Sequence, residues 1–496
     1  MERYLKIYRE KRRILKAYEY FNWIVNWDQE TEAPDRSLPY RTKQVETMTE
    51  EQYRHMADPD YVEAIERLYE RRDELDVDLS AEIRKEYKDL RIIKRVPKDE
   101  YIAYRVLTSS APKVWAEAKE KDDFSLFEPT LERIVTFNRK LVKYLETDEL
   151  KGYDILLDFY EEGFSTELYD TFFEHLRTEL VPFVRAVTDE HRKHRFSRKL
   201  KGVFPVEKQR EFAEYLKEVL HFSGVLKESV HPFTSGVSST DTRITTHYDE
   251  TNFTSSIFST IHEIGHALYE TQNDPKYDDT FLHGGASLGM HESQSRFYEN
   301  VIGRSRAFWD THYARLAQTF PKQLKNIGLD EFYRFINHTK RSLIRIEADE
   351  LTYALHVMVR YELEKSLIDG RMKVADLPKK WRTLMTRYVG KRPKTDREGV
   401  LQDVHWSSGS FGYFPTYALG SAYAAQIRFA MAKELDIDQA IRENRIKDIN
   451  DWLKERIHRY AAARTPRELM RLSTGADFDP RYYVDYLRDK FALTQD

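Results

Sequence analysis

Apolar residues recur at intervals of three and four positions along most of this chain, and turn residues fall mainly between such runs. Clear examples are the segments 61–75, 130–146, 209–222 and 348–370. This spacing places apolar side chains on one face of an α-helix, and that face must pack against other elements. The last segment ends on Gly370, a residue type that often follows a helix. The sequence therefore predicts a mainly α-helical protein.

One short segment breaks the helical pattern. Residues 241–247, with the sequence DTRITTH, are rich in β-branched residues in alternation and predict a β-strand. A strongly helical run follows at 253–270, so we expect a small sheet beside that helix. Nothing that reads as a linker, a low-complexity tract or a repeat of 20 to 50 residues divides the chain. We therefore expect one large domain spanning residues 1–496, two-lobed around a cleft.

Composition excludes several kinds of protein. The 80 basic and 84 acidic residues give a net charge of −4 without blocks of like charge. Neither nucleic acid nor an anionic membrane is therefore expected as the main partner, and a peptide or small molecule is. Cysteine is absent, which leaves histidine and carboxylate as the strong metal ligands. The charged N-terminal segment and the lack of long apolar runs predict a cytoplasmic protein.

The helical run at 253–270 contains the pentapeptide HEIGH, from His262 to His266. Histidines four residues apart lie on one helix face with Cβ atoms about 5 to 6 Å apart, so both can reach one metal ion. Glu263 lies about 100° around the helix from His262, where it can bind a water and act as a general base. Random placement of the 16 histidines and 84 acidic residues would give about 0.1 such motifs. The motif therefore indicates a zinc site.

A catalytic zinc ion usually has three protein ligands and one open position, so a third ligand must come from another segment. Glu292 is the best candidate. It lies 26 residues beyond His266, on a second amphipathic helix predicted to begin near Ser287, and that gap suits one antiparallel return. Glu299, two turns farther along the same helix face, and His291 are the alternatives.

Hydrolysis of a peptide also needs groups that hold the substrate and stabilise the oxyanion. His231 and Arg243 lie close in sequence to the predicted strand. A free C-terminal carboxylate is best held by a bidentate guanidinium, for which Arg243 and Arg345 are the candidates. Glu347 and Asp349 are close enough in sequence to occupy Arg345 instead.

The segment 399–417 is rich in glycine and aromatic residues and shows no helical period. Loops of this kind often carry functional sites. Within it, His405, Tyr413 and Tyr417 could donate hydrogen bonds to the oxyanion or to a substrate carbonyl, or could serve only in aromatic packing. Gln402 is a further candidate for substrate binding.

These segments together resemble the thermostable carboxypeptidase family of metallopeptidases, also called the carboxypeptidase Taq family. The family's signature segments occur here in order, as HPF at His231, DTRIT at Asp241, HEIGH at His262, HESQSR at His291, IRIEAD at Ile344 and GVLQDVHW at Gly399. The segments 26–34, 111–129 and 153–165 are also similar to that family, so the resemblance covers essentially the whole chain.

The resemblance implies a carboxypeptidase that releases single residues from peptide C-termini with broad side-chain tolerance, using zinc that cobalt can replace. It assigns Glu263 as the base and Arg345, rather than Arg243, as the carboxylate clamp, with Arg243 bracing the strand. It assigns the metal to His262, His266 and Glu292.

The same resemblance implies a nearly all-helical, saddle-like fold with a deep groove, similar to neurolysin and angiotensin-converting enzyme, and a homodimer. The residues by themselves leave two alternatives open. One is an oligo-endopeptidase of related fold, and the other is a catalytically inactive helical binding protein.

Overall fold

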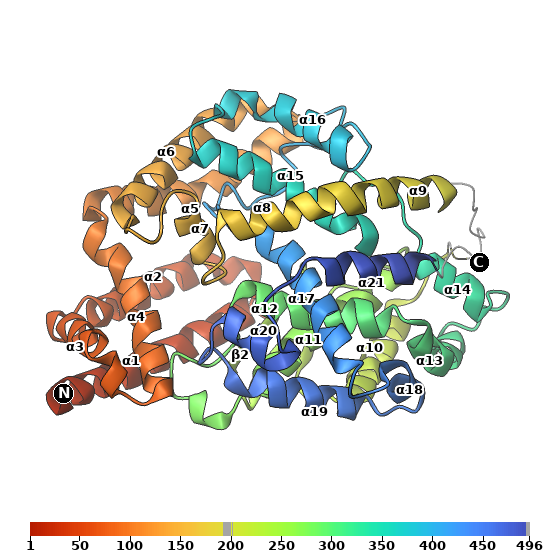
Figure 1. Ribbon diagram of the computed structural model, residues 1–496, viewed down its shortest axis with the longest axis horizontal. Helices are drawn as coiled ribbons and strands as arrows, with labels where there is room; N and C mark the ends of the chain where they lie inside the picture. Colours follow the sequence, from red (N-terminus) through yellow and green to blue (C-terminus); the bar gives the residue numbers. More distant parts are fainter. Residues whose placement is uncertain (192–199, 201, 493–496) are drawn as a thin grey trace.

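Helices form most of the computed structural model, which describes residues 1–191, 200 and 202–492 (Figure 1). A single small sheet accompanies them among the described residues. The prediction of a mainly helical protein with a small sheet near the HEIGH helix is therefore confirmed. No described helix is long and apolar enough to cross a membrane.

The helices form two groups in the view of Figure 1. The upper group contains α5 (Lys98–Lys121), α6 (Glu128–Leu145), α7 (Asp154–Asp158), α8 (Thr166–His175), α9 (Val181–His191), α15 (Glu350–Ile368) and α16 (Leu377–Tyr388). The lower group contains α1 (Glu2–Thr31), α2 (Leu38–Met56), α3 (Pro59–Glu70), α4 (Val77–Arg95), α10 (Val206–Leu220), α11 (Phe253–Thr271), α12 (Leu288–Arg296), α13 (Arg306–Thr319), α14 (Leu329–Ile336), α17 (Pro415–Met431), α18 (Ile437–Arg442), α19 (Ile446–Arg456), α20 (Pro466–Thr474) and α21 (Arg481–Ala492).

The sheet has three strands in the order β1 (Leu226–Glu228), β3 (Asp241–Thr246) and β2 (Thr234–Ser238). Strand β3 runs parallel to β1 and antiparallel to β2. It coincides with the predicted strand but ends one residue earlier. The hydroxyl oxygens of Thr246 on β3 and Ser259 on α11 lie 2.9 Å apart. The sheet therefore lies directly against the helix that carries HEIGH.

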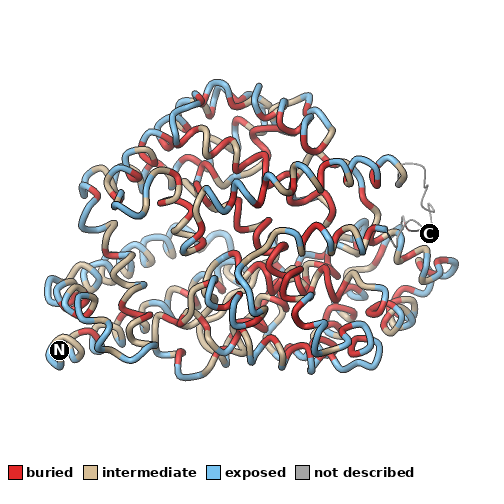
Figure 2. Tube along the Cα trace, viewed as in Figure 1, coloured by how far each residue is buried: buried red, intermediate tan, exposed pale blue. Residues whose placement is uncertain are grey.

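Most buried apolar side chains belong to one large cluster that extends from Val96 to Phe491 and includes helices of both groups. A smaller cluster joins α1, α3 and α4. Figure 2 shows buried residues concentrated in the middle of the lower group, where α11, α12 and α17 pack together. The prediction that residues 1–496 form one domain stays a prediction.

The segment 399–417 departs in part from its prediction as a loop. Residues up to Phe414 lie outside regular helices, but α17 begins at Pro415, so Tyr417 lies in a helix. The predicted helix from Ser287 also differs along its length. Ser287 caps α12 by accepting from the backbone N–H of Met290 at 3.0 Å, but a π-helical segment, η7 (Phe297–Gly303), replaces the α-helix beyond Arg296.

Candidate active site

Two glycines bring three helices close together at the HEIGH motif. A Cβ atom on Gly265, the fourth residue of the motif, would lie 2.7 Å from Cα of Ser295 on α12. A Cβ atom on Gly420 of α17 would lie 2.6 Å from Cβ of Glu292. Only glycine permits such close approach of one backbone to its neighbour. Helix α12 is therefore held tightly between α11 and α17, and Glu292 lies at that crossing.

His262, His266 and Glu292 bring one donor atom each to a common point. Their donor atoms lie within 4.8 Å of one another. Nε2 of His262 is 3.7 Å and Nε2 of His266 is 3.5 Å from Oε2 of Glu292. In a tetrahedral zinc site with ligand bonds of 2.0 to 2.2 Å, neighbouring donor atoms lie about 3.3 to 3.6 Å apart. The three residues therefore fit a divalent metal ion that keeps one position open.

The other imidazole nitrogens already have partners, which fixes the nitrogens that face the metal position. Nδ1 of His262 lies 2.9 Å from Oε2 of Glu299. Nδ1 of His266 lies 2.6 Å from Nδ1 of His291, whose Nε2 lies 3.0 Å from Oε1 of Glu270. Since the Glu270 carboxylate can only accept, neutral His291 carries its proton on Nε2 and accepts the Nδ1 proton of His266. His262 and His266 thus each direct an Nε2 lone pair at the candidate metal position.

Glu299 and His291, the two alternatives for the third ligand, therefore orient the histidines in this structure. The π-helical segment η7 places Glu299 beside His262, and π-helical turns are frequent at functional sites. Glu292 is the carboxylate that faces both Nε2 atoms. Its assignment as the third ligand stays a prediction, which this geometry supports.

Two arginines balance the charge of the two carboxylates on α12 and η7. Arg296 donates from Nε to Oε1 of Glu292 at 2.7 Å and from Nη1 to Oε2 of Glu299 at 3.2 Å. Arg304 donates to Oε1 of Glu299 at 3.2 Å. Burial alone would raise the pKa of Glu292, but Arg296 and the two histidines lower it well below its usual range. Glu292 is therefore ionised, as a metal ligand must be.

We expect Glu299→Gln to lower metal affinity about tenfold, because a neutral amide orients the Nδ1–H of His262 less strongly than a carboxylate does. The affinity can be measured by competition with a chelator of known strength. Glu292→Ala is the matched comparison, because it removes a ligand and should abolish stoichiometric metal binding. Unchanged affinity in Glu299→Gln would show that the contact with His262 does not serve the metal.

Glu263 is buried on α11 beside the metal position, with 7 % of its surface exposed. The hydroxyl of Thr234 on β2 donates to its Oε2 at 2.7 Å. Burial raises the pKa of Glu263, while His262 and the Thr234 hydrogen bond oppose that rise. A raised pKa makes a carboxylate a stronger base. Strand β2 therefore orients the side chain of the predicted base.

The aromatic residues predicted to face the reaction lie together near the start of α17. The ring of His405 is 5.4 Å from that of Tyr413 and 6.2 Å from that of Tyr417. Tyr413 and Tyr417 are also within range of each other, with hydroxyl oxygens 3.5 Å apart. Tyr417 lies one helical turn before Gly420, which touches Glu292. The three side chains thus lie on the side of α17 that meets α12, the helix of Glu292.

His405 is neutral at neutral pH, because burial and then Arg345 lower its pKa to about 4. Its Nε2 lies 3.5 Å from the hydroxyl oxygen of Tyr417. Its Nδ1 is buried and has no hydrogen-bond partner among the described residues. A neutral imidazole with a free nitrogen can donate one hydrogen bond to a ligand.

Arg345, the predicted carboxylate clamp, is 5 % exposed and is bound by a residue far away in sequence. Its Nε and Nη2 donate to Oδ1 of Asp403 at 3.1 and 2.9 Å, and its Nη1 donates to the hydroxyl of Tyr353 at 3.0 Å. Neither Glu347 nor Asp349 fills this role. Asp349 instead caps α15, accepting from the backbone N–H of Thr352. These three contacts leave two of the five guanidinium N–H groups of Arg345 for a ligand.

A second arginine shares the same carboxylate. Arg360 is fully buried and donates from Nε to Oδ2 of Asp403 at 2.7 Å. Gln402 accepts from Nη2 of Arg360 at 2.7 Å and from the backbone N–H of Arg345 at 2.9 Å. Two guanidinium groups therefore share one carboxylate, which leaves one formal positive charge in a buried place. Such a place attracts an anionic ligand group.

Tyr353 connects this arginine pair with the metal position. Its hydroxyl accepts from Arg345. Its ring faces the guanidinium of Arg296, whose Cζ lies 4.4 Å from the ring centroid, a distance typical of a cation–π contact. Arg296 in turn binds Glu292. The candidate clamp and the candidate metal ligand are thus joined through one side chain.

His231 and Arg243 lie at the sheet, away from these contacts. Arg243 makes a bidentate pair with Asp241, both distances being 2.8 Å, and its Cζ lies 4.4 Å from the ring centroid of Trp23. His231 is exposed in the connection between β1 and β2. The roles of these residues and of Gln402 in substrate binding stay predictions.

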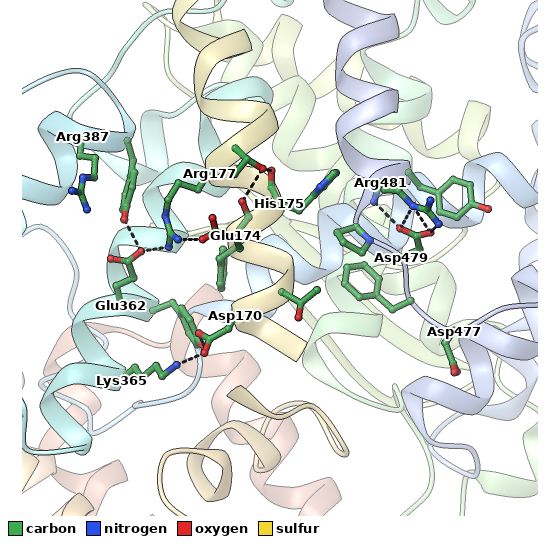
Figure 3. A pocket seen from close by; sticks show the side chains of 18 of the residues that line it. Asp170, Glu174, His175, Arg177, Glu362, Lys365, Arg387, Asp477, Asp479 and Arg481 are labelled. Atoms are coloured by element: carbon green, nitrogen blue, oxygen red, sulfur yellow. Dashed lines mark hydrogen bonds and ion pairs between the residues drawn. The ribbon is translucent and has the colours of Figure 1, made fainter. Parts of the chain in front are cut away.

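A cavity of about 1490 Å³ lies elsewhere, between α8, α15, α16 and residues 476–482 (Figure 3). None of the predicted site residues lines it. Arg177 pairs there with Glu174 and Glu362, and Arg481 pairs with Asp479. Several of its charged side chains are therefore matched in ion pairs.

Sequence reasoning missed several residues that hold the site together. They are Asp403, Arg360, Tyr353, Thr234, Arg296 and Glu270. Arg296 could have been recognised, since it is four residues beyond Glu292 on one helix face. Asp403 is 58 residues from Arg345, and no local pattern relates the two.

Comparison with known proteins identifies the wider group to which the chain is similar. The family model "Carboxypeptidase Taq (M32) metallopeptidase" matches residues 7–491. Carboxypeptidase 1 of Bacillus subtilis is 40% identical over 473 residues, covering 95% of this chain and 94% of that protein. The structure of Trypanosoma cruzi metallocarboxypeptidase 1 is 33% identical, with a TM-score of 0.94 and 99% of each chain covered. The M32 carboxypeptidase of Deinococcus radiodurans is 31% identical, with a TM-score of 0.93 and the same coverage.

Proposed function

The chain belongs to the carboxypeptidase Taq (M32) family of metallopeptidases, and we propose that it is a zinc-dependent carboxypeptidase with broad specificity that releases single amino acids from peptides. The carrying observation is the convergence of His262, His266 and Glu292 on one point. Two imidazole nitrogens and one carboxylate oxygen are a donor set that suits zinc, and cobalt can occupy the same set. When bound, the metal would polarise the scissile carbonyl and lower the pKa of a water.

Glu263 is the general base in this proposal. Its carboxylate takes a proton from the attacking water and then gives a proton to the leaving amine, so that the peptide bond breaks without a free hydroxide or an amide anion. Thr234 holds Oε2 at 2.7 Å, so Oε1 is the oxygen that exchanges the proton. His405 and Tyr413 donate hydrogen bonds to the oxyanion as negative charge develops on it.

Arg345 binds the free carboxylate of the substrate in this proposal. Support comes from the unmatched positive charge that Arg345 and Arg360 share around Asp403. Gln402 is hydrogen-bonded to both arginines and so supports the clamp. Arg243 is paired with Asp241 and is proposed to brace strand β3. Tyr417, whose ring centroid is 5.0 Å from Cζ of Arg345, closes one side of the carboxylate position. His231 lies at the sheet margin and is proposed to meet the more distant part of the peptide.

The experiment that tests this function compares a peptide carrying a free C-terminus with the same peptide amidated. We expect sequential release of single amino acids from the free acid and little release from the amide, because the amide cannot form the ionic contact. Equal cleavage of both would indicate an endopeptidase. Absence of cleavage in protein that carries one zinc ion per chain would indicate a binding protein. The homodimer implied by the family and the cytoplasmic location expected from the sequence stay predictions.

A further inference from the structure

Glu364 of α15 is a carboxylate with no exposed surface, and all three of its hydrogen-bond partners are donors. Its Oε1 accepts from Nε1 of Trp406 at 2.7 Å. Its Oε2 accepts from the backbone N–H of Gly412 at 2.8 Å and from the hydroxyl of Tyr153 at 2.5 Å. One side chain of α15 therefore ties down two points of the segment between Gln402 and Phe414.

The two tied residues are chain neighbours of the two proposed oxyanion donors. Trp406 follows His405, and Gly412 precedes Tyr413. Gly412 has φ of 92°, and a Cβ atom there would lie 2.3 Å from the carbonyl oxygen of Leu156. The backbone at Gly412 therefore has little freedom to move. Fixing Trp406 and Gly412 sets the separation and direction of the His405 and Tyr413 side chains.

A carboxyl group satisfies this arrangement, and an amide does not. Both oxygens of ionised glutamate accept, whereas a glutamine presents an NH₂ group to one of the donors and leaves that donor without an acceptor. Burial raises the pKa of Glu364 to about 7, while the three hydrogen bonds and Arg360 oppose that rise. A charge is costly to bury unless its hydrogen bonds are complete.

A second buried carboxylate makes a matched arrangement on the metal side. Glu161 accepts from the backbone N–H of Gly289 at 2.9 Å and from the hydroxyl of Tyr423 at 3.1 Å. Gly289 lies in the first turn of α12, three residues before Glu292. Glu161 therefore anchors the helix that carries the metal ligand, whereas Glu364 anchors the loop that carries the oxyanion donors.

We infer that Glu364 is a positioning residue of the active site, which holds His405 and Tyr413 in their working geometry through Trp406 and Gly412. This inference rests on the proposed function, because the two donors have catalytic roles only in peptide hydrolysis. Glu364 itself does not touch the substrate.

The test is Glu364→Gln in the zinc-loaded enzyme. We expect kcat on a free-acid peptide to fall about tenfold to a hundredfold, as small displacements of catalytic groups do. KM should change little, because Arg345 is held by Asp403, outside the tied residues. Zinc affinity should match the wild type. In protein labelled with 5-fluorotryptophan, the ¹⁹F resonance of Trp406, assigned through Trp406→Phe among the seven tryptophans, should shift.

A double variant separates positioning from general loss of structure. If Glu364 acts through the oxyanion donors, Glu364→Gln should lower kcat far less in a His405→Ala background than in the wild type. Glu161→Gln is the matched control, and it should weaken zinc binding without shifting the Trp406 resonance. If Glu364→Gln does not fold, Trp406→Phe removes one of the three hydrogen bonds and should give a smaller loss of kcat.

Two results would overturn the inference. One is a Glu364→Gln enzyme with wild-type kcat and an unshifted Trp406 resonance. The other is a fully multiplicative effect with His405→Ala, which would assign Glu364 to overall stability. A zinc-loaded wild type that releases no amino acid would instead overturn the proposed function. The ¹⁹F shift would then decide alone whether Glu364 anchors the loop.

Discussion

Glu263→Gln should bind zinc as the wild type does and lose turnover by about 10²- to 10⁴-fold, the range that general-base catalysis supplies. The amide keeps the size of the side chain and can still accept from Thr234, but it cannot take a proton from water. Glu263 is not one of the three residues whose donor atoms converge, so metal content should not change. Elemental analysis and the rate of amino-acid release from a free-acid peptide measure the two quantities.

Glu263→Asp is the control for that prediction. It retains a carboxylate but shortens the side chain by one methylene, which removes the oxygen from the reach of Thr234. Partial activity in this variant, above that of Glu263→Gln, would show that the carboxylate itself matters. Release of amino acids by Glu263→Gln at the wild-type rate would contradict the assignment of the base.

The parts of this site that sequence predicts are those set by local helical geometry. The spacing of His262 and His266 fixes their common face without reference to any other segment. The helix of Glu292 begins where its cap, Ser287, predicts. Strand β3 matches its β-branched pattern to within one residue. Each of these features depends on interactions between residues fewer than about five positions apart.

The parts that sequence does not predict depend on contacts between distant segments. Arg345 has acidic neighbours at Glu347 and Asp349, yet its partner is Asp403, because the chain returns to it after α15 and α16. Glu299 lies on the same predicted helix face as Glu292, but the π-helical segment η7 changes the direction of its side chain. The tertiary arrangement decides both cases, so neither pairing could be read from spacing.

The two halves of the site therefore differ in how they are built. The metal half is made of neighbouring helices that cross at glycines, and its geometry is fixed by backbone packing. The substrate half is made of long side chains from η8 (Arg345–Glu347), α15 and the 399–414 segment, joined by buried charges. Tyr353 links the two halves, because it contacts Arg345 in the substrate half and Arg296 in the metal half. Substitutions in the substrate half should otherwise alter selectivity more than metal content.

Arg345→Met should lower kcat/KM on a free-acid peptide by about 10²- to 10³-fold, because it removes charge-assisted hydrogen bonds to the substrate carboxylate. Activity on the amidated peptide should change much less, so the ratio between the two substrates should fall steeply. The fold should survive the substitution. Asp403 keeps its two contacts with Arg360, of 2.7 and 2.5 Å, so no buried carboxylate is left unpaired.

Arg243→Met is the matched control, because it removes the other arginine that sequence proposes as a clamp. Arg243 is already engaged by both oxygens of Asp241 and by the ring of Trp23, and it lies at the sheet rather than beside Tyr353. We expect this variant to keep the preference for the free acid, even if its overall rate is lower. Retained preference in Arg345→Met together with lost preference in Arg243→Met would move the clamp to the sheet, because the arginine that recognises the carboxylate is the one whose removal equalises the two substrates.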